Sequence, residues 1–142
     1  LLQLKNRPSH KGLILISANW QQLQPFAKPL STEQMTTVMA TWPGPVTWLV
    51  PAADSTSPLL TGEHTTIAVR ITAHPIAAEL CKAFGGAIIS TSANRNTLPP
   101  CTTAEEVAAL FEAELDFILE GPTGNLVGPT AIRDLITGKT LR

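Results

Sequence analysis

The sequence has little charge, few cysteines and no long apolar run, and each shortage narrows what the chain can be. Asp, Glu, Lys and Arg make up 15% of its 142 residues, and the net charge is −1. This charged fraction is below the roughly 25% that is typical of soluble domains. Because the net charge is −1, the chain has no overall basic field that would attract nucleic acid. Any anion-binding site must therefore be a local cluster of cations.

The sequence contains no run of about 18 apolar residues and no signal-peptide pattern. We therefore expect a cytoplasmic protein with no membrane association. A chain of 142 residues is long enough for one domain with its own core, and we assign residues 1–142 to a single domain.

Two cysteines and three histidines offer no metal site. Cys81 and Cys101 are too few and too far apart for a disulfide framework or a zinc site, so we expect two reduced thiols. His10, His64 and His74 stand at no metal-ligand spacing, and His74 before a proline is typical of a helix start. No protein-ligated metal is expected.

Common catalytic motifs are also absent. The Gly138-Lys139-Thr140 segment resembles the end of a phosphate-binding P-loop, but position 133 is Arg where that motif requires Gly. Only two residues follow Thr140, so the helix that a P-loop needs cannot form. The sequence has no Gly-x-Ser-x-Gly elbow, which removes local support for hydrolase chemistry.

Strand and helix patterns alternate along the chain. This order predicts an α/β fold, with a single twisted mixed parallel and antiparallel sheet, flanking helices and an open cavity at the strand ends. We expect strands at residues 12–16, 46–50, 66–71, 87–89 and 116–119, and a hairpin over 131–135 and 139–141. We expect helical segments at residues 20–26, 31–42, 75–84 and from 103 onward, with a loop at 52–64.

Three polar clusters lie beside these expected strands. Lys5-x-Arg7 is either a solvated helix end or an anion clamp, because Arg binds phosphate through two hydrogen bonds and Lys supplies a point charge. Residues 90–94 form either a turn that satisfies its own backbone or a site for a polar ligand. Arg70, inside an apolar strand, needs an anionic partner, which is either a structural carboxylate or that of a substrate.

Five motifs, in order, resemble the YrdC-like, or TsaC-type, threonylcarbamoyl-AMP synthases of bacteria, and the resemblance runs from residue 1 to residue 142. The motifs are Lys5-x-Arg7-Pro8-x-x-Lys11-Gly12-Leu13-Ile14-Leu15, Trp42-Pro43-Gly44-Pro45-Val46-Thr47, Ala68-Val69-Arg70-Ile71, Ser90-Thr91-Ser92-Ala93-Asn94 and Ile132-Arg133-Asp134.

The resemblance implies a nucleotidyltransferase that joins L-threonine, bicarbonate and ATP, with Mg²⁺, into threonylcarbamoyl-adenylate and pyrophosphate. Partner proteins would use the adenylate to modify adenosine 37 of tRNA. By position, Lys5 and Arg7 would be catalytic and would bind ATP together with Ser92 and Asn94. Arg70, Ser90 and Thr130 would bind threonine.

The chain also departs from the family pattern. Relatives commonly have Ser-Gly at Asn96-Thr97, Arg at Thr102 and Asp at Ala73. They also carry an N-terminal strand and a Thr-Glu-containing substrate loop before the point that corresponds to Leu1, so we expect upstream sequence to be missing.

Three other functions remain open at this stage. One is a non-catalytic YrdC-like module that binds double-stranded RNA or ribosomal particles, and this is the main alternative. The others are a carbamoyl-transfer domain of a hydrogenase-maturation protein and a degenerate paralogue.

Overall fold

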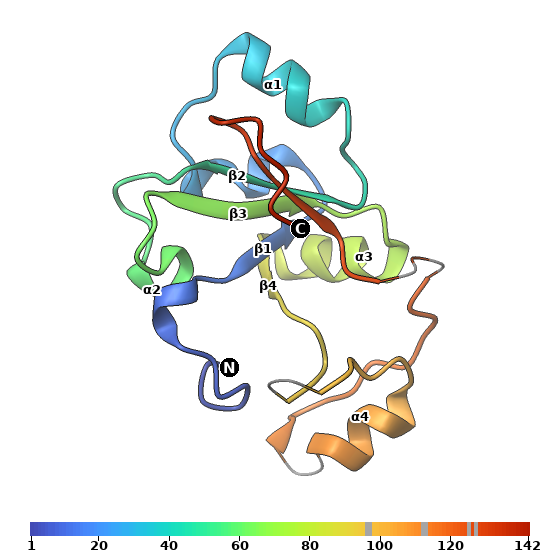
Figure 1. The fold of residues 1–142 in the computed structure, drawn as a ribbon. Helices are drawn as coiled ribbons and strands as arrows, with labels where there is room; N and C mark the ends of the chain where they lie inside the picture. Colours follow the sequence, from blue (N-terminus) through green and yellow to red (C-terminus); the bar gives the residue numbers. More distant parts are fainter. Residues whose placement is uncertain (96–97, 112–113, 125, 127) are drawn as a thin grey trace.

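One mixed sheet organises the chain (Figure 1). The computed structural model describes residues 1–95, 98–111, 114–124, 126 and 128–142, and in these residues five strands lie in the order β4-β1-β3-β2-β5. The β1–β3 and β2–β5 pairs are parallel, whereas β1–β4 and β2–β3 are antiparallel, which confirms the expected mixed sheet. The strands are β1 Ile14–Ser17, β2 Val46–Pro51, β3 Thr66–Ile71, β4 Ile88–Ser90 and β5 Ala131–Asp134.

The helices are short and carry the end signals that the sequence predicts. Ser31 and Gln34 form a capping box at the start of the first α-helix, with both reciprocal hydrogen bonds present. Gly85 ends the third α-helix in the left-handed conformation, which glycine adopts without steric cost. The α-helices are α1 Thr32–Met39, α2 Pro58–Thr61, α3 Pro75–Phe84 and α4 Ala104–Phe111, and the 3₁₀ turns are η1 Ser9–Lys11, η2 Trp20–Gln22 and η3 Gln24–Phe26.

One face of the sheet forms the hydrophobic core. Leu15, Trp48 and Val69 stand side by side on β1, β2 and β3 and are buried. They pack in one cluster with Leu23 beside η2 and Val38 of α1, so the 3₁₀ turns and α1 cover this face. Burial of each large apolar side chain stabilises the fold by about 1.5–3 kcal/mol.

The opposite face of the sheet is only half covered. Because side chains alternate along a strand, residues 14 and 16 of β1 and residues 68 and 70 of β3 share this second face. Most of these residues are partly exposed, in contrast to the buried residues between them in sequence. Arg70 and Ser90 lie on this open face.

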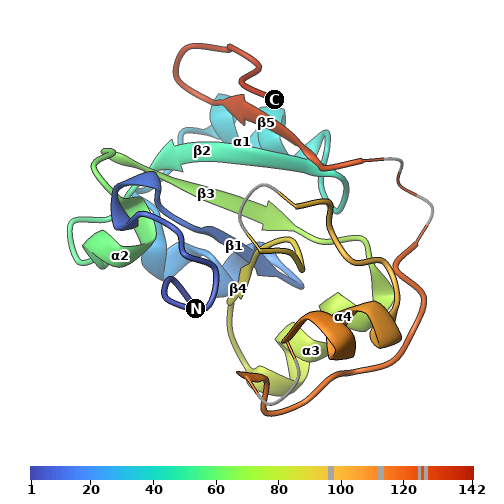
Figure 2. The ribbon, with the colours of Figure 1, turned by 60° about the horizontal axis from the view of Figure 1, so that its bottom comes forward.

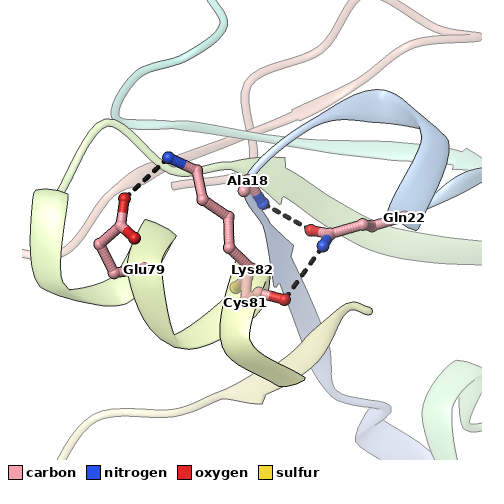
Figure 3. Close-up of polar contacts among 5 residues, drawn as sticks. All are labelled: Ala18, Gln22, Glu79, Cys81 and Lys82. Carbon is pink, nitrogen blue, oxygen red and sulfur yellow. Dashed lines mark hydrogen bonds and ion pairs between the residues drawn. The ribbon is translucent and has the colours of Figure 1, made fainter. Parts of the chain in front are cut away.

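Gln22 fixes α3 against the end of β1 (Figure 3). Its side-chain oxygen accepts a hydrogen bond of 2.8 Å from the Ala18 amide, and its side-chain nitrogen donates one of 3.0 Å to the Cys81 carbonyl. Lys82 and Glu79 form a 2.7 Å ion pair on the exposed side of the same helix. Gln22 therefore links β1 to the middle of α3, whose first turn lies at the candidate site.

Three local predictions are wrong. Residues 116–119 do not form a strand, because this segment pairs with none of the five strands of the sheet, and Phe117 is 78% exposed. One of the two alternatives for Lys5-x-Arg7, a helix end, is also wrong, because residues 2–6 form hydrogen-bonded turns in which the Lys5 amide donates to the Leu1 carbonyl at 2.9 Å. The expected loop at 52–64 contains the short helix α2.

The predicted hairpin near the C-terminus consists of β5 and a returning segment. The Asp134 amide donates to the Lys139 carbonyl at 2.8 Å, and the Leu141 amide donates to the Ile132 carbonyl at 2.8 Å. Only an isolated bridge, between Arg133 and Thr140, marks the return segment. In the described part of the chain, no helix has the length and apolarity needed to cross a membrane.

Candidate functional site

A cavity of about 680 Å³ opens at the carboxyl ends of the parallel strands β1 and β3. This is the usual place for ligands in open α/β sheets. Ile16, Arg70 and Ser90 contribute to it from three neighbouring strands, and Thr130 contributes from the residue before β5. The structure therefore brings Arg70, Ser90 and Thr130 into one cavity, and their binding of threonine stays a prediction.

Arg70 is the cation of this cavity. Its Nη1 donates to the Thr130 hydroxyl at 2.8 Å and contacts the Thr47 hydroxyl at 3.4 Å. Burial lowers the pKa of Arg70, and the positive charge of Arg142 lowers it further. Among the described residues, no carboxylate forms an ion pair with Arg70. A guanidinium with only neutral partners at a cavity wall is suited to bind a carboxylate.

The first turn of α3 and residues 121–124 form another wall of the cavity. His74 caps α3, where its Nδ1 accepts a hydrogen bond of 3.5 Å from the Ala77 amide. The other ring nitrogen, Nε2, therefore carries the proton and donates to the Pro122 carbonyl at 2.9 Å. Gly121 passes so close to α3 that an added Cβ would lie 2.5 Å from the Ile76 side chain.

This wall was not predicted from the sequence. The His74-Pro75 pair predicts a helix start, which the structure confirms. The second contact of His74 is with a residue 48 positions away, which no local pattern could reveal. Glycines at 121 and 124 were the available signal, since glycine in a segment often marks a close approach of backbone to a neighbour.

A second cluster joins the N-terminal turn to the loop after β4. The Lys5 ammonium donates to the carbonyl of Ser92 at 2.5 Å and to both the carbonyl and side-chain oxygen of Asn94. The Ser92 hydroxyl also contacts the Asn94 side-chain oxygen, at 2.8 Å. Three of the four residues predicted to bind ATP are therefore in direct contact.

Lys5 is 8% exposed, and an ammonium has three donors, each of which has an acceptor here. Burial lowers the pKa of Lys5, the nearby Arg7 adds to this effect, and Cys101 opposes it. The cluster is consequently a buried cation held by neutral oxygen atoms. An anion placed beside it would relieve the cost of burial.

Arg7, the fourth predicted ATP ligand, is held differently. Its Nε and Nη2 both donate to the Gly12 carbonyl, at 3.1 and 2.9 Å. Gly12 has a φ of 63°, and an added Cβ would lie 2.8 Å from the Leu60 carbonyl oxygen. Arg7 thus stabilises the turn that leads into β1. It also lies close enough to Lys5 for the two positive charges to repel.

The departures from the family pattern fall in different places. The Asn96-Thr97 departure lies outside the described residues. Thr102 lies beside α4, where its amide and hydroxyl donate to the Glu106 carboxylate at 2.6 and 3.3 Å. Ala73 lines the 680 Å³ cavity. No group of three or more His, Cys, Asp or Glu side chains in the described ranges is placed to hold a metal ion.

Comparison with protein families gives one match over the whole chain. The Sua5_yciO_yrdC family model, described as telomere recombination, matches residues 1–142. A threonylcarbamoyl-AMP synthase of Photobacterium profundum is 52% identical over 144 residues, covering 100% of this chain and 78% of the relative. The protein of the same name from Nitrosococcus oceani is 50% identical over 142 residues, covering 100% of this chain and 77% of the relative.

Solved structures show the same likeness. The fold superposes on P. abyssi Sua5 complexed with L-threonine with a TM-score of 0.88 and 30% identity, covering 98% of this chain. The chain spans only 41% of the length of that protein. E. coli YciO, with a TM-score of 0.72 and 23% identity over 94% of this chain and 65% of its own, shares the fold.

Proposed function

The chain belongs to the Sua5_yciO_yrdC family, and from this premise we propose that it catalyses the reaction of a threonylcarbamoyl-AMP synthase. In this reaction L-threonine, bicarbonate and ATP yield threonylcarbamoyl-adenylate and pyrophosphate. The observation that carries the proposal is about 50% identity, over the full chain, to relatives that bear this name. The cavity that contains Arg70, Ser90 and Thr130 supports it independently.

Threonine is assigned to this cavity. The Arg70 guanidinium, whose described partners are hydroxyl groups, receives the threonine carboxylate. Thr130 orients that guanidinium, and Ser90, on the adjacent wall, offers a hydroxyl to the amino acid. The solved relative named as a complex with L-threonine supports this choice of ligand class.

ATP is assigned to the cluster of Lys5, Arg7, Ser92 and Asn94. Lys5 and Arg7 supply two positive charges for the phosphates, and Ser92 and Asn94 supply a hydroxyl and an amide. Because each ammonium donor of Lys5 already has an acceptor, phosphate binding exchanges one of these acceptors for a phosphate oxygen. Mg²⁺ arrives with ATP as its counter-ion.

The chemistry needs charge stabilisation more than a protein nucleophile. The threonine amine and bicarbonate form a carbamate with loss of water. A carbamate oxygen then bonds to the α-phosphorus of ATP, while the bond from that phosphorus to the bridging oxygen of pyrophosphate breaks. Negative charge builds on the departing pyrophosphate, and the fixed cations Lys5 and Arg7 stabilise it.

The step is a nucleotidyl transfer, and its product has a reactive mixed anhydride bond. Partner proteins of the tRNA-modification system would consume this adenylate in the cytoplasm. The chain itself has a net charge of −1, which does not favour RNA as its main ligand.

Pyrophosphate release tests the proposal. The assay contains ATP, bicarbonate and Mg²⁺, with and without L-threonine. It uses the 142-residue chain and a chimera that adds the unmatched part of a relative such as the Photobacterium protein. Threonine-dependent release by either protein supports the synthase. A folded chimera that releases no pyrophosphate contradicts it and favours a non-catalytic or RNA-binding role.

A further inference from the structure

The Leu4-Lys5 and Asn94-Arg95 pairs are joined by hydrogen bonds from two cationic side chains. The Lys5 ammonium donates to the Asn94 carbonyl and to its side-chain oxygen. The next residue, Arg95, reaches back, and its Nη1 donates to the Leu4 carbonyl at 3.2 Å. Lys5 follows Leu4 and Arg95 follows Asn94, so each segment contributes one cationic side chain that donates hydrogen bonds to the other segment.

Arg95 also contacts the C-terminal end of α4. Its Nη2 lies 3.5 Å from the Leu110 carbonyl, and its guanidinium carbon lies 5.2 Å from the centre of the Phe111 ring. It forms an ion pair with the Glu114 carboxylate as well. Phe111 is 3% exposed, whereas the Arg95 side chain remains 38% exposed. A cation at the end of a helix is favoured by the helix dipole.

Helix α4 lies apart from the sheet and from α3 (Figure 1), and in the second view it is again not placed over the strands (Figure 2). The hydrogen bonds at its start stay within its own segment, between Glu106 and Thr102 or Thr103. Arg95 is therefore a direct link from the end of α4 to the residues beside Lys5.

We propose that Arg95 is a positioning residue for the nucleotide site, which rests on the proposed function. By holding the Leu4 carbonyl, Arg95 fixes the start of the Lys5 side chain opposite Asn94. By holding Leu110 and Phe111, it makes α4 part of the support of the same site. Arg95 itself contacts no reacting atom. Its planar fork of donors suits a side chain that binds several acceptors, which Lys cannot reproduce fully.

The test compares Arg95→Gln with Arg95→Lys and with a matched control, Lys28→Gln. Lys28 forms an exposed ion pair with Asp54 at 2.8 Å, away from this cluster, so its variant has the same change in charge. The measurements are KM for ATP, KM for threonine, ATP binding by calorimetry, and amide hydrogen exchange of residues 104–111. They are made on the protein form that is active in the pyrophosphate assay, or on the chimera if neither form is active.

We expect Arg95→Gln to raise KM and Kd for ATP about tenfold while KM for threonine changes less than about twofold. Exchange in α4 accelerates because its anchor is lost. For Arg95→Lys, the affinity for ATP and the exchange rate in α4 should lie between those of Arg95→Gln and the parent. For Lys28→Gln, both should match the parent.

Three results would overturn the inference. One is an unchanged affinity for ATP in Arg95→Gln. Another is an equal loss for both substrates together with a lower melting temperature, which indicates a general structural role. The third is a parent protein that binds no ATP. If the parent binds ATP but releases no pyrophosphate with threonine, the proposed function fails, and the calorimetry and exchange still decide the role of Arg95.

Discussion

Arg70 and Thr130 are joined by a hydrogen bond of 2.8 Å although 60 residues separate them in sequence. Strand β2 lies between β3, which carries Arg70, and β5, which Thr130 directly precedes, and the buried Thr47 of β2 contacts both side chains at 3.4 Å. The hydroxyl groups of Thr47 and Thr130 therefore hold the guanidinium in one orientation at the cavity. A guanidinium fixed in this way loses little further conformational entropy when a carboxylate binds.

Substitution of Arg70 and Thr130 tests this arrangement. Arg70→Lys keeps the charge but loses the planar fork, so we expect KM for threonine to rise at least about tenfold. Thr130→Val removes the orienting hydroxyl at similar volume, and we expect a rise of about threefold to tenfold. Thr130→Ser keeps a hydroxyl, so its KM for threonine should be nearer to that of the parent than the KM of Thr130→Val. Pyrophosphate release against threonine concentration measures all three, and identical Ser and Val variants would contradict the orienting role.

Substitution of Lys5 and Arg7 tests the ATP assignment. Lys5→Ala removes a buried cation and leaves the Ser92 and Asn94 oxygen atoms without their donor. Arg7→Ala frees the Gly12 carbonyl. We expect both changes to raise KM for ATP about tenfold or more, with much smaller effects on KM for threonine. Circular dichroism checks that each variant folds. Equal losses for the two substrates would argue against the assigned roles.

Local signals in the sequence were enough to predict most of the elements. The Ser31 and Gln34 capping box, the alternation in β3 and the glycine that ends α3 each depend on neighbours within a few residues. The false strand at 116–119 shows where this fails. An apolar run has strand propensity, but a strand also needs a partner edge, and the local pattern cannot say which segment takes it.

The candidate site was predictable only as separate motifs. The strand position of Arg70 predicts a cation that needs a partner, yet its contact with Thr130 depends on the order of β3, β2 and β5. Lys5 and Asn94 are 89 residues apart, and their contact follows from the tertiary fold. The family resemblance grouped these residues, whereas the contacts of His74 and Arg95 emerged only from the structure.

The two thiols are expected to differ in reactivity. Cys81 is fully buried, and its Sγ lies 3.6 Å from the Ile16 carbonyl, to which it can donate. Burial raises the pKa of the Cys81 thiol, so less of it is thiolate at about pH 8 than for an ordinary cysteine. Cys101 is partly exposed. Iodoacetamide should therefore modify Cys101 in the native protein and Cys81 only after unfolding, as peptide mass spectrometry would show. Native labelling of Cys81 in Cys101→Ser would contradict this expectation.

Asp134 gives the C-terminal segment a predictable dependence on pH. Its Oδ1 accepts hydrogen bonds from the amides of Ile136 at 2.8 Å and Thr137 at 3.0 Å, which closes the turn after β5. The Thr137 amide is the main reason that the pKa of Asp134 lies below its ordinary value of 3.8, and the Ile136 amide adds to it. Because folding lowers this pKa, the ionised carboxylate contributes stability above about pH 4 that is lost as the pH falls through the folded-state pKa.

Asp134→Asn keeps the acceptor and the shape but removes the charge. We expect the parent to be more stable than this variant by about 0.5–1 kcal/mol near neutral pH, since the turn is partly exposed and its hydrogen bonds are screened by water. The difference should shrink as the pH falls from about 4 toward 2, where the parent carboxyl becomes protonated. Urea unfolding of both proteins across this range measures it. A difference that stays constant or grows on acidification would show that the Asp134 charge does not stabilise the turn.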